Sequence, residues 1–373
     1  MGTLEGMPAG LELSIERVDR ELARRQRGYG RGGRMKIERD RAELLSGLKG
    51  GVTLGSPIAL LVRNKDHVIE RLPIPSNPRP GHADLAGCQK YTHRDPRAIL
   101  ERASARETAA RVALGGVARQ VLEHFGIELF AHVVELGGDA VADEAFERAG
   151  NARHELREAS DFLSLDPEAD ARFRASVDAA REDRDTLGGV FEVRALGLPP
   201  GLGGFADAQE RLTARLGGAL FSIPAMKGVE FGIGFASARR PGSQVHDALY
   251  PVEGEAAAPW GGFRRETNRS GGLEGGMTTG EPLVCRVAMK PIPSLKRGLP
   301  SVDLTTGDAL PATYQRSDVT SVPAASVVGE AVVSLVLASA FLEKFAGDAL
   351  EHVEDAYAAW KARVERLGRG ASG

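Results

Sequence analysis

The order of helix-like and strand-like segments is the feature that most constrains the fold of this chain. Short runs rich in β-branched and apolar residues predict strands, whereas apolar residues spaced three and four apart predict helices. The two kinds do not repeat as strand–helix–strand units, as a doubly wound parallel sheet would require. We therefore favour an α+β fold with antiparallel sheets. The predicted strands are Val52–Val62, Ile127–Leu136, Val190–Leu196, Val229–Phe235 and Leu283–Met289, and the predicted helices are Ser14–Gln26, one starting near Ser104, Asp166–Glu182, Gln209–Phe221 and Val327–Phe345.

Charge and cysteine content narrow the classes of function. A formal net charge of -3 gives no global reason to expect a nucleic acid or a membrane as partner, so an anion site would have to be a local cluster. Only Cys88 and Cys285 are present, outside any metal-ligand spacing, which predicts no metal site and a reducing, cytoplasmic location. The start of the chain has no signal-peptide pattern, and the apolar segment Ala331–Phe345 is too short for a bilayer. The charged segment Ala140–Glu168 is predicted to be an exposed excursion.

Arginine and glycine alternate in the segment that follows the first predicted helix. Residues 24–34 read Arg-Arg-Gln-Arg-Gly-Tyr-Gly-Arg-Gly-Gly-Arg. Guanidinium groups bind phosphate and carboxylate through paired hydrogen bonds, and glycines let the backbone bend around an anion. The segment fits a polyanionic small ligand, but a solvated basic loop or a nucleic-acid contact would explain it as well.

Two further segments combine arginine with groups that move protons or bind anions. Residues 79–84, Arg-Pro-Gly-His-Ala-Asp, place His82 beside an arginine and an aspartate, and histidine is suited to proton transfer near neutral pH. Residues 102–108 contain the capping-box spacing of Ser104 and Glu107, and a helix start flanked by two arginines suits a phosphate. A packing histidine and an ordinary capped helix are the plain alternatives.

Three segments in the C-terminal half complete the set. Paired glycines in residues 267–277 suggest backbone lying against a bulky ligand, and Lys-Pro-Ile-Pro-Ser follows at 290–294. Residues 316–318 place Asp318 close to Arg316 before the last core helix, a pair that is more often structural than catalytic. From the residues alone, we infer an enzyme or a binding protein for a phosphorylated, multiply charged small molecule.

All five segments, in this order, resemble the signatures of the chorismate synthase family, and the similarity runs from Leu4 to about Gly347. The resemblance implies helices sandwiched between antiparallel sheets, one domain over residues 1–373 and a homotetramer. It implies a lyase that converts 5-enolpyruvylshikimate-3-phosphate to chorismate and needs reduced FMN. In such an enzyme the flavin supplies the chemistry, and the protein supplies the position and the charge of the surrounding groups. Whether NADPH reduces the flavin on this chain or an external reductase does so is not determined by the sequence.

The resemblance also implies roles for individual residues. The implied catalytic residues are His82, Asp318 and Ser104. His82 matches a histidine thought to protonate flavin, and Asp318 matches an acid assisting proton removal at the flavin nitrogen. Pro224 stands where many members have a polar amide. The implied substrate-binding residues are Arg25, Arg31, Arg34, Arg79, Arg106 and Arg316, and the implied cofactor-binding residues are Arg25, Arg31, Arg102, Ala103, Ser104, Pro224, Ala225, Gly275, Lys290, Pro291, Ile292, Pro293, Ser294 and Arg316.

One departure from the family pattern concerns the N-terminus. Family members normally begin with a strand and a Gly-Glu-Ser-His-Gly segment whose histidine is thought to protonate the departing phosphate, and the resemblance here starts just after it. Two explanations follow from the sequence. Either the printed chain is a shortened form of a normal enzyme, or it is a degenerate homologue that binds FMN and anions without efficient turnover.

Overall fold

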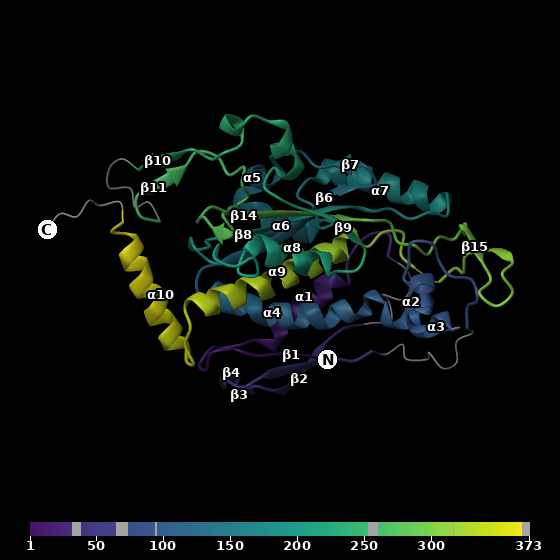
Figure 1. Ribbon diagram of the computed structural model, residues 1–373, viewed down its shortest axis with the longest axis horizontal. Helices are drawn as coiled ribbons and strands as arrows, with labels where there is room; N and C mark the ends of the chain where they lie inside the picture. The colour runs from purple at the N-terminus through teal and green to yellow at the C-terminus, as the bar shows by residue number, and fades with distance from the viewer. Residues whose placement is uncertain (32–38, 65–73, 94, 253–259, 316, 368–373) are drawn as a thin grey trace.

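The computed structural model describes residues 1–31, 39–64, 74–93, 95–252, 260–315 and 317–367. Helices lie between two antiparallel sheets, so the predicted α+β sandwich is confirmed (Figure 1). The larger sheet has five strands in the order β7-β6-β8-β14-β9, and the smaller has three in the order β1-β5-β2. These strands are β1 Gly2–Leu4, β2 Ala42–Ser46, β5 Ile58–Val62, β6 Glu128–Leu136, β7 Asp139–Ala140, β8 Gly189–Leu196, β9 Met226–Phe231 and β14 Leu283–Met289.

The five-stranded sheet follows the predicted pattern closely. In β14 the side chains of Leu283, Cys285 and Val287 are fully buried and alternate with partly exposed ones, as expected for a strand with one face on the core. Strand β9 was predicted to reach Phe235 but ends at Phe231. The reason is Gly232, whose φ of +56° turns the chain out of the sheet into the 3-10 helix η5, Gly234–Arg239.

The smaller sheet corrects one prediction. The run Val52–Val62 is not one strand but two, because residues 54–57 form a turn with Gly55 at a φ of +75°. The first part, β4 Val52–Thr53, pairs with β3 Leu48–Lys49 in a small hairpin. The second part, β5, is the central strand of the three-stranded sheet and pairs with β1 and β2 on its two sides.

Three helices fill the middle layer: α1 Ile15–Arg25, α4 Thr108–His124 and α9 Val322–Lys344. α4 and α9 pack so closely that a Cβ added to Gly115 would lie 2.4 Å from the Cβ of Ala331. Helix α9 starts five residues before the predicted Val327, since Pro323 fits the first helical turn. With 23 residues, α9 is long and apolar enough to cross a membrane, so the prediction that this apolar segment is too short for a bilayer is wrong. However, 78% of its most apolar 18-residue stretch is buried inside the fold.

The segment predicted to be an exposed excursion contributes to a second core on the outer face of the larger sheet. It contains the short helices α5 Ala145–Ala149 and α6 Arg153–Ala159, and Phe162 is fully buried against α7 Pro167–Glu182. The prediction of exposure holds for most of this segment and is wrong for residues 162–165, which are buried although charged residues surround them in the sequence. Asp166 caps α7 as predicted, accepting hydrogen bonds from the backbone N–H groups of Glu168 and Ala169.

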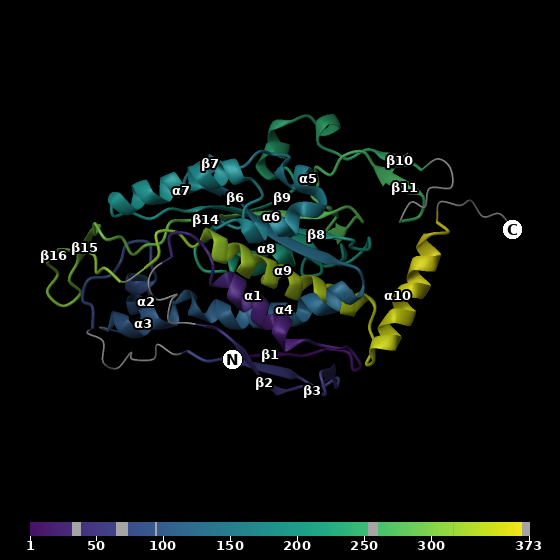
Figure 2. The ribbon, with the colours of Figure 1, turned by 180° about the vertical axis from the view of Figure 1, so that it is seen from behind.

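The other elements lie around the sandwich. α2 Asp84–Tyr91 and α3 Pro96–Arg102 form a pair beside the start of α4, α8 Leu212–Phe221 starts later than the predicted Gln209, and α10 Leu350–Val364 was not predicted. Figures 1 and 2 show α10 at one end of the molecule and α2, α3 and β15 at the other. The short strands are β10 Leu249–Pro251, β11 Phe263–Arg265, β12 Leu273–Glu274, β13 Met277–Thr278, β15 Pro300–Val302 and β16 Ala309–Pro311.

Candidate functional site

The predicted site segments gather mainly at the end of the sandwich where α4 and α9 begin. Both helices run in the same direction from this end, which lies next to α2 and α3 and opposite α10 (Figure 1). Their N-termini therefore point the positive ends of two helix dipoles toward the same region. This region also receives the loops that follow α1 and β14, so segments from most of the chain converge there.

Arg79, His82 and Asp84 form one hydrogen-bonded group before α2. The buried carboxylate of Asp84 accepts from Arg79 Nε at 2.8 Å and lies 2.5 Å from His82 Nδ1. Burial alone would raise the pKa of Asp84, but the hydrogen bonds from His82 and Arg79 outweigh burial and hold that pKa well below its ordinary value. Asp84 thus remains a carboxylate that fixes the position of both neighbours.

The Lys290–Ser294 segment, directly after β14, connects the parts of the site. Arg79 Nη1 donates to the Ser294 hydroxyl at 2.8 Å, and Lys290 Nζ donates to the carbonyl of Gly81. The backbone N–H of Lys290 donates to the carbonyl of Ala225 at 3.0 Å. Burial, and next to it the charge of Lys227, lowers the pKa of Lys290.

The same segment is held from its other side by two hydroxyls. Thr186 donates to the carbonyl of Ile292 at 2.7 Å, and Ser317 donates to the carbonyl of Ser294 at 2.8 Å. Ala225 has a φ of +74°, an uncommon backbone conformation for a residue with a side chain, directly after Pro224. Pro224, Ala225 and the Lys290–Ser294 segment are therefore brought together, as their predicted common role requires.

A cavity of about 140 Å³ lies between Ser294 and the start of α9. Arg31 and Asp318 face each other there with 3.2 Å between Nε and the carboxylate, and the Ser321 hydroxyl donates to Asp318 at 3.1 Å. Four cations line this cavity against two carboxylates, which suits an anionic ligand. The charged lining residues are Arg31, Arg181, Arg184, Lys296, Asp185 and Asp318.

Arg25 and Arg106 form a neighbouring group around Asp40. The buried Asp40 carboxylate lies 2.6 Å from Arg106 Nη1 and 3.6 Å from Arg25 Nη1. Arg25 also donates to the Thr108 hydroxyl at 2.9 Å, so it ties the end of α1 to the start of α4. This arrangement gives Arg25 a structural role in the folded chain, and Arg25, Asp40 and Arg106 do not line the cavity that holds Asp318.

The predicted capping box at Ser104 is only half formed. The Ser104 hydroxyl accepts from the backbone N–H of Arg106 at 3.3 Å and caps the 3-10 helix η3, Ala105–Glu107, before α4 proper begins at Thr108. Glu107 does not reach back to Ser104, because its carboxylate accepts from Arg111 Nε at 2.9 Å. Arg102 is exposed, and Ala103 ends α3 beside it.

Gly275 lies apart from the other predicted cofactor residues. It belongs to the β12–β13 hairpin, and an added Cβ on the neighbouring Gly272 would lie 2.9 Å from the Cα of Leu283, at the start of β14. Lys290 follows the end of this seven-residue strand, so about 23 Å of strand separates the two places. Arg34 and Arg316, both predicted substrate ligands, lie outside the residues that the structure describes.

Several residues of this region were not singled out from the sequence. Asp40 carries the negative charge that holds Arg25 and Arg106, and Arg184, Lys296 and Thr186 line or support the cavity. Asp84, in contrast, belongs to the predicted segment 79–84, although the sequence did not show that it holds both Arg79 and His82. Nothing in the sequence around Arg184 or Lys296 distinguishes them from ordinary surface cations.

A basic cavity next to two helix starts, in an α+β sandwich, defines a protein that handles a small, multiply charged anion. The family model described as chorismate synthase matches residues 1–342, and the chain belongs to the chorismate synthase family. It is 51% identical to chorismate synthase of Geobacter sulfurreducens over 95% of this chain and 93% of that protein. Chorismate synthase of Aquifex aeolicus is also 51% identical, over 94% of this chain and 91% of its own length.

A solved structure agrees with these relatives. A crystal structure of chorismate synthase superimposes with a TM-score of 0.77 at 43% identity and covers 97% of this chain and 93% of that one. The chain is therefore an enzyme of the chorismate synthase type, a lyase of aromatic amino acid biosynthesis. Identity of this degree over nearly the whole chain does not favour the degenerate-homologue reading.

Proposed function

We propose that this chain removes phosphate and a proton from 5-enolpyruvylshikimate-3-phosphate to give chorismate, with reduced FMN as cofactor. One observation carries the proposal: the Lys290–Ser294 segment joins the His82 group to the cavity that holds Arg31 and Asp318. This connection supports the proposal that the predicted acid–base residues and the cations act on one ligand, in a chain of this family. The substrate carries one phosphate and two carboxylates, and it requires fixed positive charge around a small volume.

In this proposal the cations bind and orient the substrate. Arg31, Arg184 and Lys296 line the cavity, and Arg106 lies at the neighbouring helix start. Arg79 is buried and tied to Asp84, so we assign it the role of holding His82 and Ser294 rather than of binding phosphate directly. Arg34 and Arg316 remain predicted ligands of the phosphate and carboxylates.

The donor groups of the site also fit a flavin phosphate and ring. The backbone from Lys290 to Ser294 lies beside Ala225, whose positive φ turns its carbonyl toward this segment. The same segment carries or contacts three hydroxyls, those of Ser294, Thr186 and Ser317. We propose that these residues hold FMN together with Arg102, Ala103 and Ser104. Reduced flavin supplies electron density to the allylic system of the substrate when it is bound.

His82 and Asp318 are proposed to handle protons. Asp84 Oδ1 lies 2.5 Å from His82 Nδ1, and Arg79 Nη2 lies 3.0 Å from Nδ1 and 3.4 Å from Nε2. A carboxylate only accepts hydrogen bonds, so in this proposal Nδ1 carries a proton toward Asp84 and Nε2 is the nitrogen that exchanges one. Asp318 is held by Arg31 and Ser321 in the cavity that Ser294 also lines, and it assists the removal of the ring proton. Asp84 is a positioning residue in this scheme, because it acts through His82.

The test is anaerobic chorismate formation from 5-enolpyruvylshikimate-3-phosphate with FMN reduced by dithionite, compared with the variants His82→Gln and Asp318→Asn. Each variant should lose activity by roughly 10²–10⁴-fold, the range for one proton-transfer group. FMN should bind much more tightly with substrate present than without it. Tight FMN binding without turnover would instead support the non-enzymatic flavin or anion-binding module. Replacing dithionite by NADPH tests whether the chain reduces its own flavin.

We also propose that the chain forms a homotetramer of single-domain subunits, each with one main core extending from Met7 to Val353. The position of Gly275 supports an assembly, because a flavin held at Ala225 and Lys290 could reach Gly275 only from another subunit. Light scattering gives the mass of the assembly directly. Cys88 and Cys285 are buried free thiols, which fits the proposed cytoplasmic location.

A further inference from the structure

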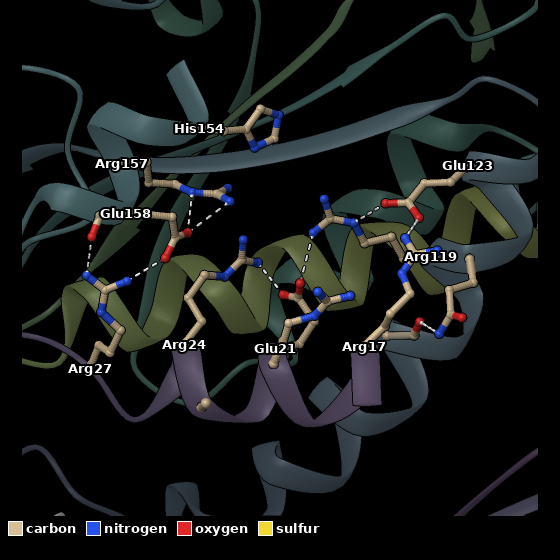
Figure 3. A pocket seen from close by; sticks show the side chains of 13 residues that line it. Arg17, Glu21, Arg24, Arg27, Arg119, Glu123, His154, Arg157 and Glu158 are labelled. Carbon is tan, nitrogen blue, oxygen red and sulfur yellow. Dashed lines mark hydrogen bonds and ion pairs between the residues drawn. The ribbon is translucent and has the colours of Figure 1, made fainter. Parts of the chain in front are cut away.

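The arginines of the first cluster that the structure describes, Arg24, Arg25, Arg27 and Arg31, belong to different sites. Arg31 lines the cavity of the candidate active site and Arg25 pairs with Asp40, whereas Arg24 and Arg27 line a separate cavity of about 530 Å³ between α1, α4 and α6. This volume lies within the range of about 300–1,000 Å³ that is typical of small-molecule sites. Figure 3 shows arginines from all three helices converging on it.

A buried carboxylate behind the lining holds three of the arginines that line this cavity. Glu330 on α9 is paired with Arg24, lies 2.9 Å from Arg119 Nη1, and lies 3.8 Å from Arg157 Nη1. Three guanidinium groups around one buried carboxylate are held in fixed positions, so they are organised before any ligand arrives. The Nε of Arg24 is buried without a hydrogen-bond partner among the described residues, while its side chain is only 7% exposed.

The cavity carries more positive than negative charge. Six arginines line it, and four carboxylates oppose them: Glu21, Glu123, Glu158 and, beneath the floor, Glu330. Burial lowers the pKa of Arg17, and the charges of Arg119 and Arg20 lower it further, as expected where positive charge is in excess. Arg20 lines the opening, is exposed, and makes no hydrogen bond or ion pair with any residue in the described ranges.

We propose that this cavity, which we call the Glu330 pocket, binds a small polyanion bearing at least two phosphate or carboxylate groups. Guanidinium groups recognise both kinds of group through paired, charge-assisted hydrogen bonds. The polar lining argues against an apolar ligand, and an anion would neutralise the surplus of two charges. The pocket lies between α1, α4 and α6 and shares no lining residue with the cavity of Arg31 and Asp318, so its ligand need not be the substrate.

The probe is inorganic pyrophosphate, with citrate as the carboxylate counterpart, titrated calorimetrically at constant ionic strength. The double variant Arg17→Gln/Arg20→Gln should lose one bound equivalent per chain or weaken binding at least about tenfold, because two charge-assisted contacts disappear. The control Arg148→Gln removes an exposed arginine of α5 and should bind as the wild type does. Acetate, which carries one charge, should bind far more weakly than either probe.

Unchanged stoichiometry and affinity for both probes in the double variant would overturn the proposal. A change of assembly mass in the double variant, with no effect on pyrophosphate or citrate, would also overturn it and would assign the pocket to an acidic segment of another copy. Thermal melting of each variant verifies that the fold is intact, and Arg24 is left in place because its removal would strand Glu330. Loss of chorismate formation is not a readout here, so the outcome is independent of the proposed function.

Discussion

Replacing Asp84 by Asn tests the hydrogen-bonded group on which the candidate site depends. The change keeps the size of the side chain but removes the charge that neutralises Arg79, which is only 8% exposed. Leaving one partner of a buried ion pair unpaired costs about 3–5 kcal/mol. With an unfolding entropy of about 2.1 cal/mol/K per residue, this corresponds to a fall of roughly 4–6 °C in the melting temperature of this 373-residue chain.

The pH dependence of this loss has a defined sign. Hydrogen bonds hold the pKa of Asp84 below its ordinary value in the folded chain, so its carboxylate stabilises the fold at neutral pH. That contribution is present above the unfolded pKa of about 3.9 and disappears as the pH falls through the folded pKa. The difference in melting temperature between wild type and Asp84→Asn should therefore be constant from pH 5 to pH 8 and shrink below about pH 4.

Activity gives the second readout. In Asp84→Asn, the His82 ring faces an uncharged amide in place of the carboxylate that orients it, so kcat should fall and the pH profile of kcat should shift while the Km for substrate changes little. The control Asp207→Asn changes an exposed aspartate in the loop before α8 and should alter neither melting nor kcat. If Asp84→Asn melts like the wild type at pH 7 and keeps its pH–rate profile, the assignment of Asp84 as a positioning residue is wrong.

Three further changes probe the layers around the site. Asp40→Asn removes the carboxylate that Arg25 and Arg106 share, so the free energy of unfolding should fall by about 3 kcal/mol in urea titrations. Glu330→Gln should destabilise by about 3–5 kcal/mol, since it removes the buried carboxylate that three guanidinium groups share, and calorimetry should show a lower melting temperature. Gly115→Ala should push α4 away from α9, because the new methyl group would lie 2.4 Å from Ala331. Thermal melting should show that the free energy of unfolding falls by about 1–3 kcal/mol. The control Gly217→Ala adds a methyl group in open space and should show no such loss.

Local sequence patterns predicted some helices and strands correctly. They were misleading where contacts between distant segments determine the structure. The alternation in Leu283–Met289 and the Asp166 cap gave the strand and the helix start directly. In Ala140–Glu168 the signal failed, because burial there depends on single residues such as Phe162 and on the outer face of a sheet formed by distant segments. The break inside Val52–Val62 was readable in principle, since Gly55 and Pro57 both mark a turn.

The candidate site was predictable as a set of segments but not as a set of contacts. Motif order indicated which loops take part, and the structure brings His82, Ser294, Arg31 and Asp318 into one region through the Lys290–Ser294 segment. The partners that hold them could not be read, because pairings such as Asp40 with Arg106 join residues far apart in the sequence. For Gly275 the motif match was misleading about position. This residue lies about one strand length from Ala225 and Lys290, with which it was predicted to bind the cofactor.

The division of the arginine cluster follows from helical geometry. Successive residues of a helix point about 100° apart, so adjacent arginines at the end of α1 cannot face the same partner. Arg25 turns toward Asp40 and the start of α4, while Arg24 turns toward Glu330, a carboxylate buried in α9. The last turn of α1 therefore contributes one arginine beside the candidate active site and one arginine to the Glu330 pocket. A run of like charges that reads as a single anion site in the sequence serves two sites in the folded chain, because each arginine meets a different buried acid.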